Sequence, residues 1–263
     1  MLEQLRRTPP APLPEYRDRF ERDGFLVLRD FLTPEETDSI REGWGRFLSD
    51  IAPGLSNAHV MYEDRDDPDS LKQADCIHLE PALDAWRRQG KVRELAEFLI
   101  GPVVPQNGEF FDKPPGGKGT PPHQDGFYFC LEPNSACTVW IPLEPVDEEN
   151  GALTYVRGSH RNGVLDHGDS SILGFSQALK ANLGSTPEHV LCPVQPGDIL
   201  AHHALTIHYA GKNRSQTRHR RSIGYVFFSA SARRDEAAWA RYQTSLARQR
   251  QAKGIAHPDS PIQ

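Results

Sequence analysis

The tripeptide His123-Gln124-Asp125 places an imidazole and a carboxylate two residues apart. If the segment is a strand, His123 and Asp125 project from the same face, because strand side chains alternate with a period of two. Two histidines and one carboxylate on one face hold Fe(II) and leave coordination positions open. The tripeptide therefore predicts part of an iron site, to which another segment must bring a second histidine.

The surroundings distinguish this tripeptide from similar ones. The pattern recurs at His167/Asp169 and His257/Asp259, with a glutamate version at His78/Glu80. The stretch around His167 is rich in Gly and Ser and is typical of a loop. His257 lies in a Pro-containing tail, and His78 precedes a helical pattern. Only His123/Asp125 is followed by aromatic residues that favour strands.

The second histidine has several candidates in the later segments. They are His160, His167, His189, His202, His203, His208 and His219. His208 follows the apolar run Leu205-Thr206-Ile207 and precedes a loop, which is where ligands usually lie. We favour His208, with His203 as the main alternative from the residues alone.

Composition limits the class of protein. The chain has 263 residues, a formal net charge of −6 and 37% hydrophobic residues. The acidic balance argues against a nucleic-acid partner. No apolar run is long enough to span a membrane, and the N-terminus lacks the apolar core of a signal peptide. The four cysteines form no C-x-x-C, so we expect reduced thiols and a cytoplasmic protein.

The order of the sequence patterns along the chain predicts helices first and a β core after them. Thr33-Pro34-Glu35-Glu36 is a helix start with a capping residue and a proline at the first position. Short apolar and aromatic runs separated by Gly and Pro begin at residue 102 and indicate an all-β barrel or sandwich. We expect one domain, residues 1–263, divided as follows: 1–14 a loose arm, 15–101 a helical support region, 102–229 the β core, and 230–263 a C-terminal helix and tail.

Two segments are expected to be irregular. Residues 52–75 are acidic, and residues 161–188 form a Gly- and Ser-rich insert in the core that is partly helical at 175–181. The acidic run within 52–75 is most simply a solvated loop. Whether one of them acts as a lid over the site stays open.

An ordered set of motifs resembles the phytanoyl-CoA dioxygenase family of Fe(II)- and 2-oxoglutarate-dependent oxygenases. The set runs over residues 109–228. It comprises Lys113-Pro114-Pro115-Gly116, His123-Gln124-Asp125-Gly126, Val139-Trp140-Ile141-Pro142-Leu143, Asn150-Gly151-Ala152-Leu153, Gly158-Ser159-His160, Pro196-Gly197-Asp198, Ile207-His208, Asn213-Arg214-Ser215 and Arg220-Arg221-Ser222-Ile223. No single motif is specific, but their order and spacing are.

The resemblance implies a double-stranded β-helix, the jelly-roll fold of cupins, which is mainly β with flanking helices. It implies His123, Asp125 and His208 as iron ligands. It places Arg220, with Ser222 beside it, on the far carboxylate of 2-oxoglutarate. Lys113 and Trp140 match positions at the co-substrate. The implied reaction uses Fe(II), 2-oxoglutarate and O2, supported by ascorbate, and hydroxylates an unactivated C–H with release of succinate and CO2.

Some alternatives remain at this stage. Arg218 has the same strand parity as Arg220 and is the second choice for the carboxylate. A cupin-like binder or a zinc enzyme on the same fold would use the same ligands without turning over 2-oxoglutarate. We expect a small-molecule substrate, such as a secondary metabolite or an amino-acid-like compound, no membrane partner, and a monomer or homodimer. The sequence does not choose the substrate.

Overall fold

The fold follows from a computed structural model, which describes residues 14–62, 64, 66, 67, 70–170, 172, 174–181, 183 and 188–252. Most of the expected N-terminal arm and the end of the C-terminal tail, with His257/Asp259, lie outside these residues. Among the described residues, no helix is long and apolar enough to cross a bilayer.

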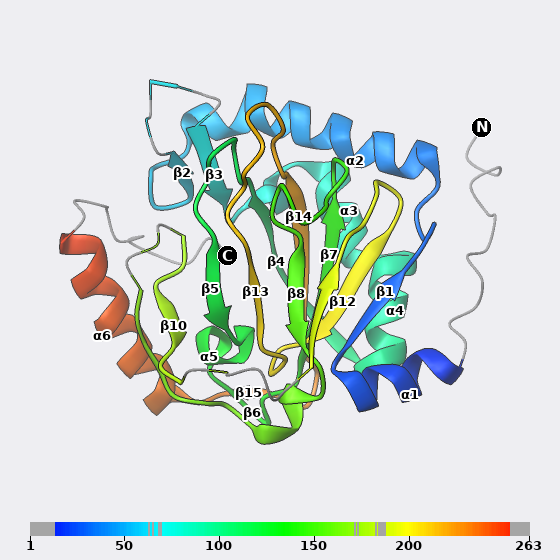
Figure 1. The fold of residues 1–263 in the computed structure, drawn as a ribbon, viewed down its shortest axis with the longest axis vertical. Coiled ribbons are helices and arrows are strands. Elements are labelled where there is room, and N and C mark those ends of the chain that lie inside the picture. The colour runs from blue at the N-terminus through cyan, green and yellow to red at the C-terminus, as the bar shows by residue number, and fades with distance from the viewer. Residues whose placement is uncertain are drawn as a thin grey trace.

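Two antiparallel sheets face each other and form the centre of the molecule (Figure 1). The larger sheet has the order β1(Phe25–Leu28), β12(Ile199–His203), β7(Ala136–Pro142), β14(Ser222–Ser229), β4(Val103–Phe111), β3(Leu71–Ala74) and β2(Val60–Tyr62). The smaller sheet has the order β11(His189–Cys192), β8(Leu153–Val156), β13(His208–Ala210) and β5(Thr120–His123). The mainly β class with flanking helices and a jelly-roll core is confirmed.

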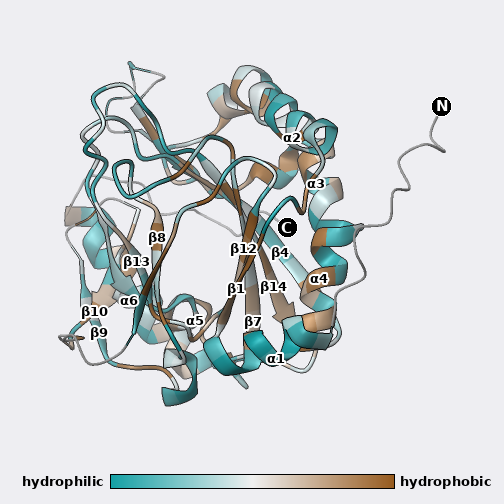
Figure 2. Cartoon of the chain, turned by 45° about the vertical axis from the view of Figure 1, so that its right-hand side comes forward, coloured by the Kyte–Doolittle hydropathy of each residue, from teal (hydrophilic) through white to brown (hydrophobic). Residues whose placement is uncertain are grey.

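Helices cover the outer face of the larger sheet, on the side away from the smaller sheet (Figure 2). They are α1(Pro14–Asp23), α2(Pro34–Arg46), α3(Pro81–Arg88) and α4(Lys91–Ile100). A π turn at Phe47–Ile51 and 3-10 turns at Ala52–Gly54, Ile77–Leu79 and Ser159–Asn162 connect elements. The expected start of α2 is confirmed, since Thr33 accepts from the Glu36 amide and Glu36 accepts from the Thr33 amide.

The strands of the larger sheet divide their side chains between two environments. Ile223, Tyr225 and Phe227 of β14 are fully buried and belong to the core under the helices. Residues of opposite parity face the smaller sheet. The register aligns one such row across five strands: Val27, Leu200, Trp140, Gly224 and Glu109. This alternation is what a half-buried sheet requires, and it turns one row of side chains toward the space between the sheets.

Three local expectations were wrong. Part of the acidic segment 52–75 forms β2 and β3, which extend the larger sheet beyond β4. Residues 175–181 contain the strand β10(Gln177–Leu179) rather than a helix. It pairs with β9(His167–Asp169), so His167/Asp169 lies on a strand and not in a loop. These segments become strands because they pair with segments elsewhere in the chain. Local composition does not reveal such pairing.

The remaining elements lie at the open edge of the smaller sheet. They are α5(Asp125–Phe129), the short pair β6(Leu131–Glu132) and β15(Arg233–Arg234), and α6(Glu236–Ala252). The expected C-terminal helix is therefore present. No residue of α6 is classed as buried, so this helix lies on the surface rather than in the core.

Candidate active site

His123, Asp125 and His208 converge between the sheets. Their ligand atoms lie within 4.8 Å of one another. His123 ends β5 and His208 begins β13, and the two are direct partners across these antiparallel strands. Nε2 of each histidine lies 3.6 Å from Oδ1 of Asp125. Strand pairing thus brings together two histidines that are distant in the sequence.

The two imidazoles are oriented by backbone carbonyls. Nδ1 of His123 lies 2.9 Å from the oxygen of Pro121, and Nδ1 of His208 lies 3.0 Å from the oxygen of Thr206. A carbonyl only accepts, so Nδ1 carries the proton in both rings. Nε2 then presents its lone pair toward Asp125, which is the tautomer that a metal ligand needs.

Asp125 does not lie on the strand. The expectation that strand alternation brings His123 and Asp125 to one face was therefore wrong. β5 ends at His123, and Asp125 is the first residue of the five-residue helix α5. The amide of Gly126 donates to the oxygen of Ala204 at 2.9 Å. This turn places the Asp125 carboxylate beside His123 by a change of chain direction. The alternation of strand side chains is not the cause.

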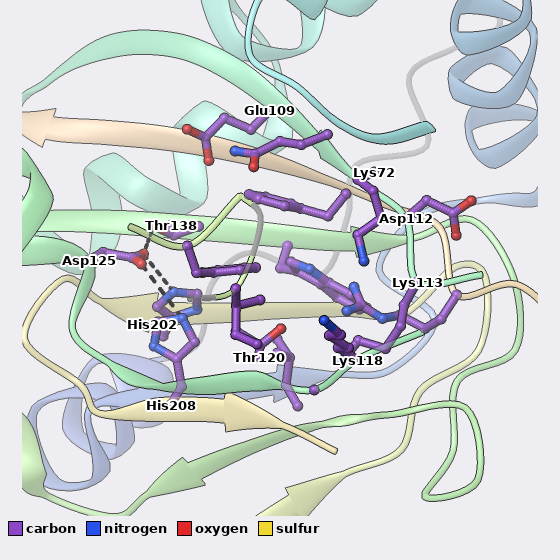
Figure 3. Close-up of a pocket in the computed structure, with 18 residues that line it drawn as sticks. Lys72, Glu109, Asp112, Lys113, Lys118, Thr120, Asp125, Thr138, His202 and His208 are labelled. Carbon is purple, nitrogen blue, oxygen red and sulfur yellow. Dashed lines mark hydrogen bonds and ion pairs between the residues drawn. The ribbon is translucent and has the colours of Figure 1, made fainter. Parts of the chain in front are cut away.

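The second oxygen of Asp125 is held by two further residues. Oδ2 accepts a hydrogen bond from Oγ1 of Thr138 at 2.8 Å and lies 3.0 Å from Nε2 of His202. Nδ1 of His202 lies 3.0 Å from the hydroxyl of the fully buried Tyr155. The chain Tyr155–His202–Asp125 fixes the carboxylate and leaves Oδ1 directed at His123 and His208. Figure 3 shows the contacts of Asp125 with Thr138, His202 and His208.

These contacts determine the charges of Asp125 and His208. Burial opposes ionisation of Asp125, but His208, His123 and His202 together hold its pKa well below the usual range. Burial and the neighbouring His123 hold the pKa of His208 well below its usual value. A carboxylate and a neutral imidazole are the forms in which these side chains bind a metal.

A narrow inner cavity extends from this group to a cationic end. Figure 3 shows Asp125, His202 and His208 at one end and Lys113 and Lys118 at the other. Arg220 and Trp140 also line this cavity. The Arg220 guanidinium carbon lies 5.5 Å from the centre of the Trp140 ring.

Lys113 and Arg220 are held side by side by the backbone. The amide of Lys113 donates to the oxygen of Arg220 at 3.2 Å, and the amide of Arg220 donates back at 3.1 Å. Residues that exchange both bonds lie directly opposite each other, with their side chains on one face. Only 3% of Lys113 and 4% of Arg220 is exposed, so Lys113 is not a surface lysine.

The protein satisfies the hydrogen-bond donors of these two basic side chains only in part. Nη1 of Arg220 donates to Oγ of Ser222 at 3.1 Å, whereas its buried Nε has no hydrogen-bond partner among the described residues. Nζ of Lys113 donates to the oxygen of Gly211 at 2.6 Å. Burial lowers the pKa of Arg220 to about 10 and, with Arg220 nearby, that of Lys113 to about 6. A buried orphaned guanidinium donor fits a dicarboxylate ligand.

The other sequence candidates lie elsewhere. His203 points to the opposite side of β12 and packs against Phe20 and His160. Nε2 of His167 accepts from the amide of Gln124, whose own side chain binds backbone groups away from the carboxylate. Arg218 forms ion pairs with Asp147 and Glu149 at the surface. None of these residues lines the inner cavity.

A larger outer cavity of about 590 Å³ adjoins the inner one. The two share Gln73, Glu109, Asp125, Ile172 and Phe175 as wall residues. α6 contributes Trp239, Tyr242 and Leu246, and residues 174–176 of the insert contribute as well. Met61, Gln73 and Asp75 come from the 52–75 segment. Both segments considered as lids therefore form walls of the cavity.

The roles of two cavity residues were not predicted from the sequence. One is Glu109, and the other is His202 as the hydrogen-bond partner of Asp125. His202 and His203 are adjacent, so only the register of β12 against β7 decides which one faces inward. Glu109 follows Gln106-Asn107-Gly108, precedes two phenylalanines and belongs to no motif. The alternation of β4, once its pairing is known, identifies it as inward-facing.

Comparison with known proteins places these features in a family. The family model described as phytanoyl-CoA dioxygenase matches residues 20–222. A probable alpha-ketoglutarate-dependent hypophosphite dioxygenase of Stutzerimonas stutzeri is 28% identical over 81% of this chain and 76% of its own length. A 1-deoxypentalenic acid 11-beta-hydroxylase of Streptomyces arenae is 27% identical over 74% and 73%.

Solved structures show the same fold. The epimerase SnoN, in complex with Fe3+, alpha ketoglutarate and nogalamycin RO, superposes with a TM-score of 0.69 and 26% identity over 85% of this chain and 86% of its own. EctD from S. alaskensis, with 2-oxoglutarate and 5-hydroxyectoine, superposes with a TM-score of 0.68 at 20% identity over 85% and 79%. The EctD match bears on the fold alone.

Proposed function

Since the chain belongs to the phytanoyl-CoA dioxygenase family, we propose that it hydroxylates an unactivated C–H of a small metabolite at the site described above. The reaction class is that of an Fe(II)- and 2-oxoglutarate-dependent dioxygenase. The assignment of residues to roles rests on one observation: two imidazoles and a carboxylate converge at one end of a cavity whose other end is lined by Lys113, Lys118 and Arg220.

We propose that His123, Asp125 and His208 hold the iron. Two imidazoles and a carboxylate leave positions for other ligands on an octahedral ion. When bound, iron and 2-oxoglutarate supply the O2 activation that gives succinate, CO2 and a hydroxylated product. The protein residues fix this centre, because the carbonyls of Pro121 and Thr206 orient the histidines.

The cationic end suits the far carboxylate of 2-oxoglutarate. Arg220, supported by Ser222, offers a planar guanidinium with an unused buried donor. Lys113 lies opposite Arg220 and supplies a second donor when protonated. Trp140 forms the wall beside Arg220. The cofactor-binding set is therefore Arg220, Ser222, Lys113 and Trp140.

Competing functions of the same fold fit less well. A zinc hydrolase has no use for a buried arginine at the far end of the cavity, whereas the family relatives named above use alpha-ketoglutarate. Halogenating relatives need the carboxylate position vacated, and Asp125 occupies it. The intact carboxylate therefore favours hydroxylation.

Substrate size and location are further parts of the proposal. The outer cavity of about 590 Å³ accommodates a small molecule, and SnoN was crystallised with nogalamycin RO. The four cysteines are buried and free, as expected for a reducing cytoplasm. We propose a single domain that acts as a monomer or homodimer.

Succinate formation tests the proposal. The protein is incubated with Fe(II), ascorbate and 2-oxoglutarate, first without oxygen and then with it. We expect succinate only after oxygen is admitted. Asp125→Ala should abolish it, whereas Asp75→Asn, which changes a carboxylate of the outer wall, should not. Succinate from Asp125→Ala at the wild-type rate would overturn the metal assignment.

A further inference from the structure

The outer cavity contains a carboxyl group that the reaction described above does not use. Glu109 lies on β4, opposite Gly224, and lines both cavities. Gly224 separates it from Trp140 in the same row of the sheet. Gly224 places no side chain between Glu109 and Trp140, and the Phe111 ring lies 3.6 Å from the position that a Cβ of Gly224 would take. Figure 3 shows Glu109 on the opposite side of the cavity from His208.

Glu109 lacks a partner within the part of the chain that the structure describes. Its carboxylate accepts no hydrogen bond and forms no ion pair there. Three of the basic side chains that line these cavities are turned to other groups: Lys113 donates to Gly211, Arg220 donates to Ser222, and Arg234 lies over the Trp239 ring. Asp75, another carboxylate of the wall, is paired with His59 at 2.9 Å. Glu109 is thus the unpaired acid of the substrate side.

An unpaired acid in such a place is unfavourable without a ligand. Burial, followed by the charges of Asp125 and Asp75, raises the pKa of Glu109 to about 8. Glu109 is half-buried in the cavity wall, and a partly desolvated carboxylate is costly unless a cation or several donors satisfy it. A positively charged ligand would remove this penalty, and a neutral one would leave most of it.

Aromatic side chains line the same cavity. Tyr128 and Phe175 lie beside His123, with ring centres 5.9 and 5.2 Å from its imidazole. Tyr242 of α6 lies 5.7 Å from Tyr128 between ring centres, whereas the Trp239 ring of the same helix has the Arg234 guanidinium carbon 4.5 Å from its centre. Aromatic faces attract organic cations, and most strongly where water is excluded. A carboxylate among aromatic rings is a combination suited to an amine.

We propose that the substrate carries a cationic nitrogen, an ammonium or substituted ammonium group, and that Glu109 binds it. Glu109 is then the residue that determines specificity, and its distance from the iron ligands sets which C–H is presented. The inference rests on the proposed function for the identity of the site as a substrate cavity. The selection of a cation does not depend on the reaction.

Equilibrium binding of two matched probes tests the inference. Phenethylamine and 2-phenylethanol share a ring and a two-carbon chain, but only the amine is charged at pH 8.5, a pH above the pKa of Glu109. Both are titrated into the anaerobic enzyme loaded with Fe(II) and 2-oxoglutarate, with ligand-observed NMR as the readout. We expect the amine to bind at least about tenfold more tightly, a modest ratio for a desolvated charge pair.

Variants decide whether Glu109 causes the preference. Glu109→Gln keeps the shape and removes the charge, so the two probes should bind within about twofold of each other. Asp75→Asn is the matched control and should retain the preference. Equal affinities in the wild type, or a preference that survives in Glu109→Gln, would overturn the inference. Circular dichroism verifies that the variants fold.

The proposed function is tested separately in the same samples. Slow succinate formation without substrate reports the reaction at the iron and does not need the cation site. Succinate without any preference for the amine would refute the Glu109 inference alone. A preference for the amine without succinate would refute the proposed function and leave the cation site in place.

Discussion

Asp125 and His202 are joined by a hydrogen bond of 3.0 Å between Oδ2 and Nε2. The bond leaves Oδ1 of Asp125 facing both His123 and His208. His202 thus orients the carboxylate without being one of the three converging ligands. Its own ring is held from the other side by the Tyr155 hydroxyl.

Replacing His202 should weaken metal binding. His202→Phe removes the donor to Asp125 and leaves the three ligands in place. Loss of such a supporting partner typically lowers metal affinity about 10- to 100-fold. Titration of the metal-free protein with Fe(II) under anaerobic conditions measures the change. His203→Phe is the control, since His203 faces the opposite side of the strand. Equal affinities in the two variants would contradict the role given to His202.

Replacing Arg220 should weaken 2-oxoglutarate binding and spare the metal. Arg220→Gln removes the guanidinium at the cationic end of the inner cavity. Hydrogen bonds to charged groups contribute about 1.5–3 kcal/mol, so the KM for 2-oxoglutarate should rise about 10- to 100-fold. Arg218→Gln, at a surface arginine paired with Asp147, should change it little. If Arg218→Gln had the larger effect, the carboxylate partner would be Arg218.

Parts of this site could be predicted from the sequence because their signals are local. The Thr33–Glu36 capping box needs only four residues, and His123 and Asp125 lie in one tripeptide. The shape of that tripeptide was not predictable, because the aromatic residues after Asp125 favour a strand and yet form α5. A backbone bond from Gly126 to the distant Ala204 contributes to that outcome.

Long-range register accounts for what the sequence could not reveal. His202 and His203 look alike until β12 is paired with β7. β2 and β3 become strands by pairing with each other and with β4, so the acidic composition of 52–75 was misleading. Arg220 and Arg218 share parity in a strand, and only burial separates them: Arg220 is buried and Arg218 is paired at the surface.

Lys113 should make the stability of the ligand-free enzyme depend on pH. Burial lowers its pKa from 10.5 to about 6. Between these values the unfolded chain binds more protons than the folded one, so the free energy of unfolding rises with pH across this window. The contribution is at most about 1.4 kcal/mol per pH unit.

Urea unfolding at pH 6.5, 7.5 and 8.5, without 2-oxoglutarate, measures the slope. Lys113→Met should remove part of the rise, so that the stability difference between wild type and variant changes steadily with pH. The exposed Lys118 lies on the same loop, and Lys118→Met controls for the loss of a lysine there. Parallel pH profiles for wild type and Lys113→Met would contradict a neutral buried lysine.

α6 should be released when Asp169 is replaced. This carboxylate of β9 accepts from Oγ of Ser245 at 2.8 Å and from Nε2 of Gln249 at 3.1 Å, and it pairs with Arg248. No residue of α6 is classed as buried, so these polar contacts carry much of its attachment. Asp169→Ala should therefore speed amide exchange in residues 236–252, because helices with few apolar contacts open at low free energy.

Hydrogen–deuterium exchange measures the opening of α6, with the exposed Asp166→Ala as the control. Since α6 forms a wall of the outer cavity but not of the inner one, 2-oxoglutarate affinity should stay unchanged. Unaltered exchange in α6 would show that its apolar contacts with the cavity suffice to hold it.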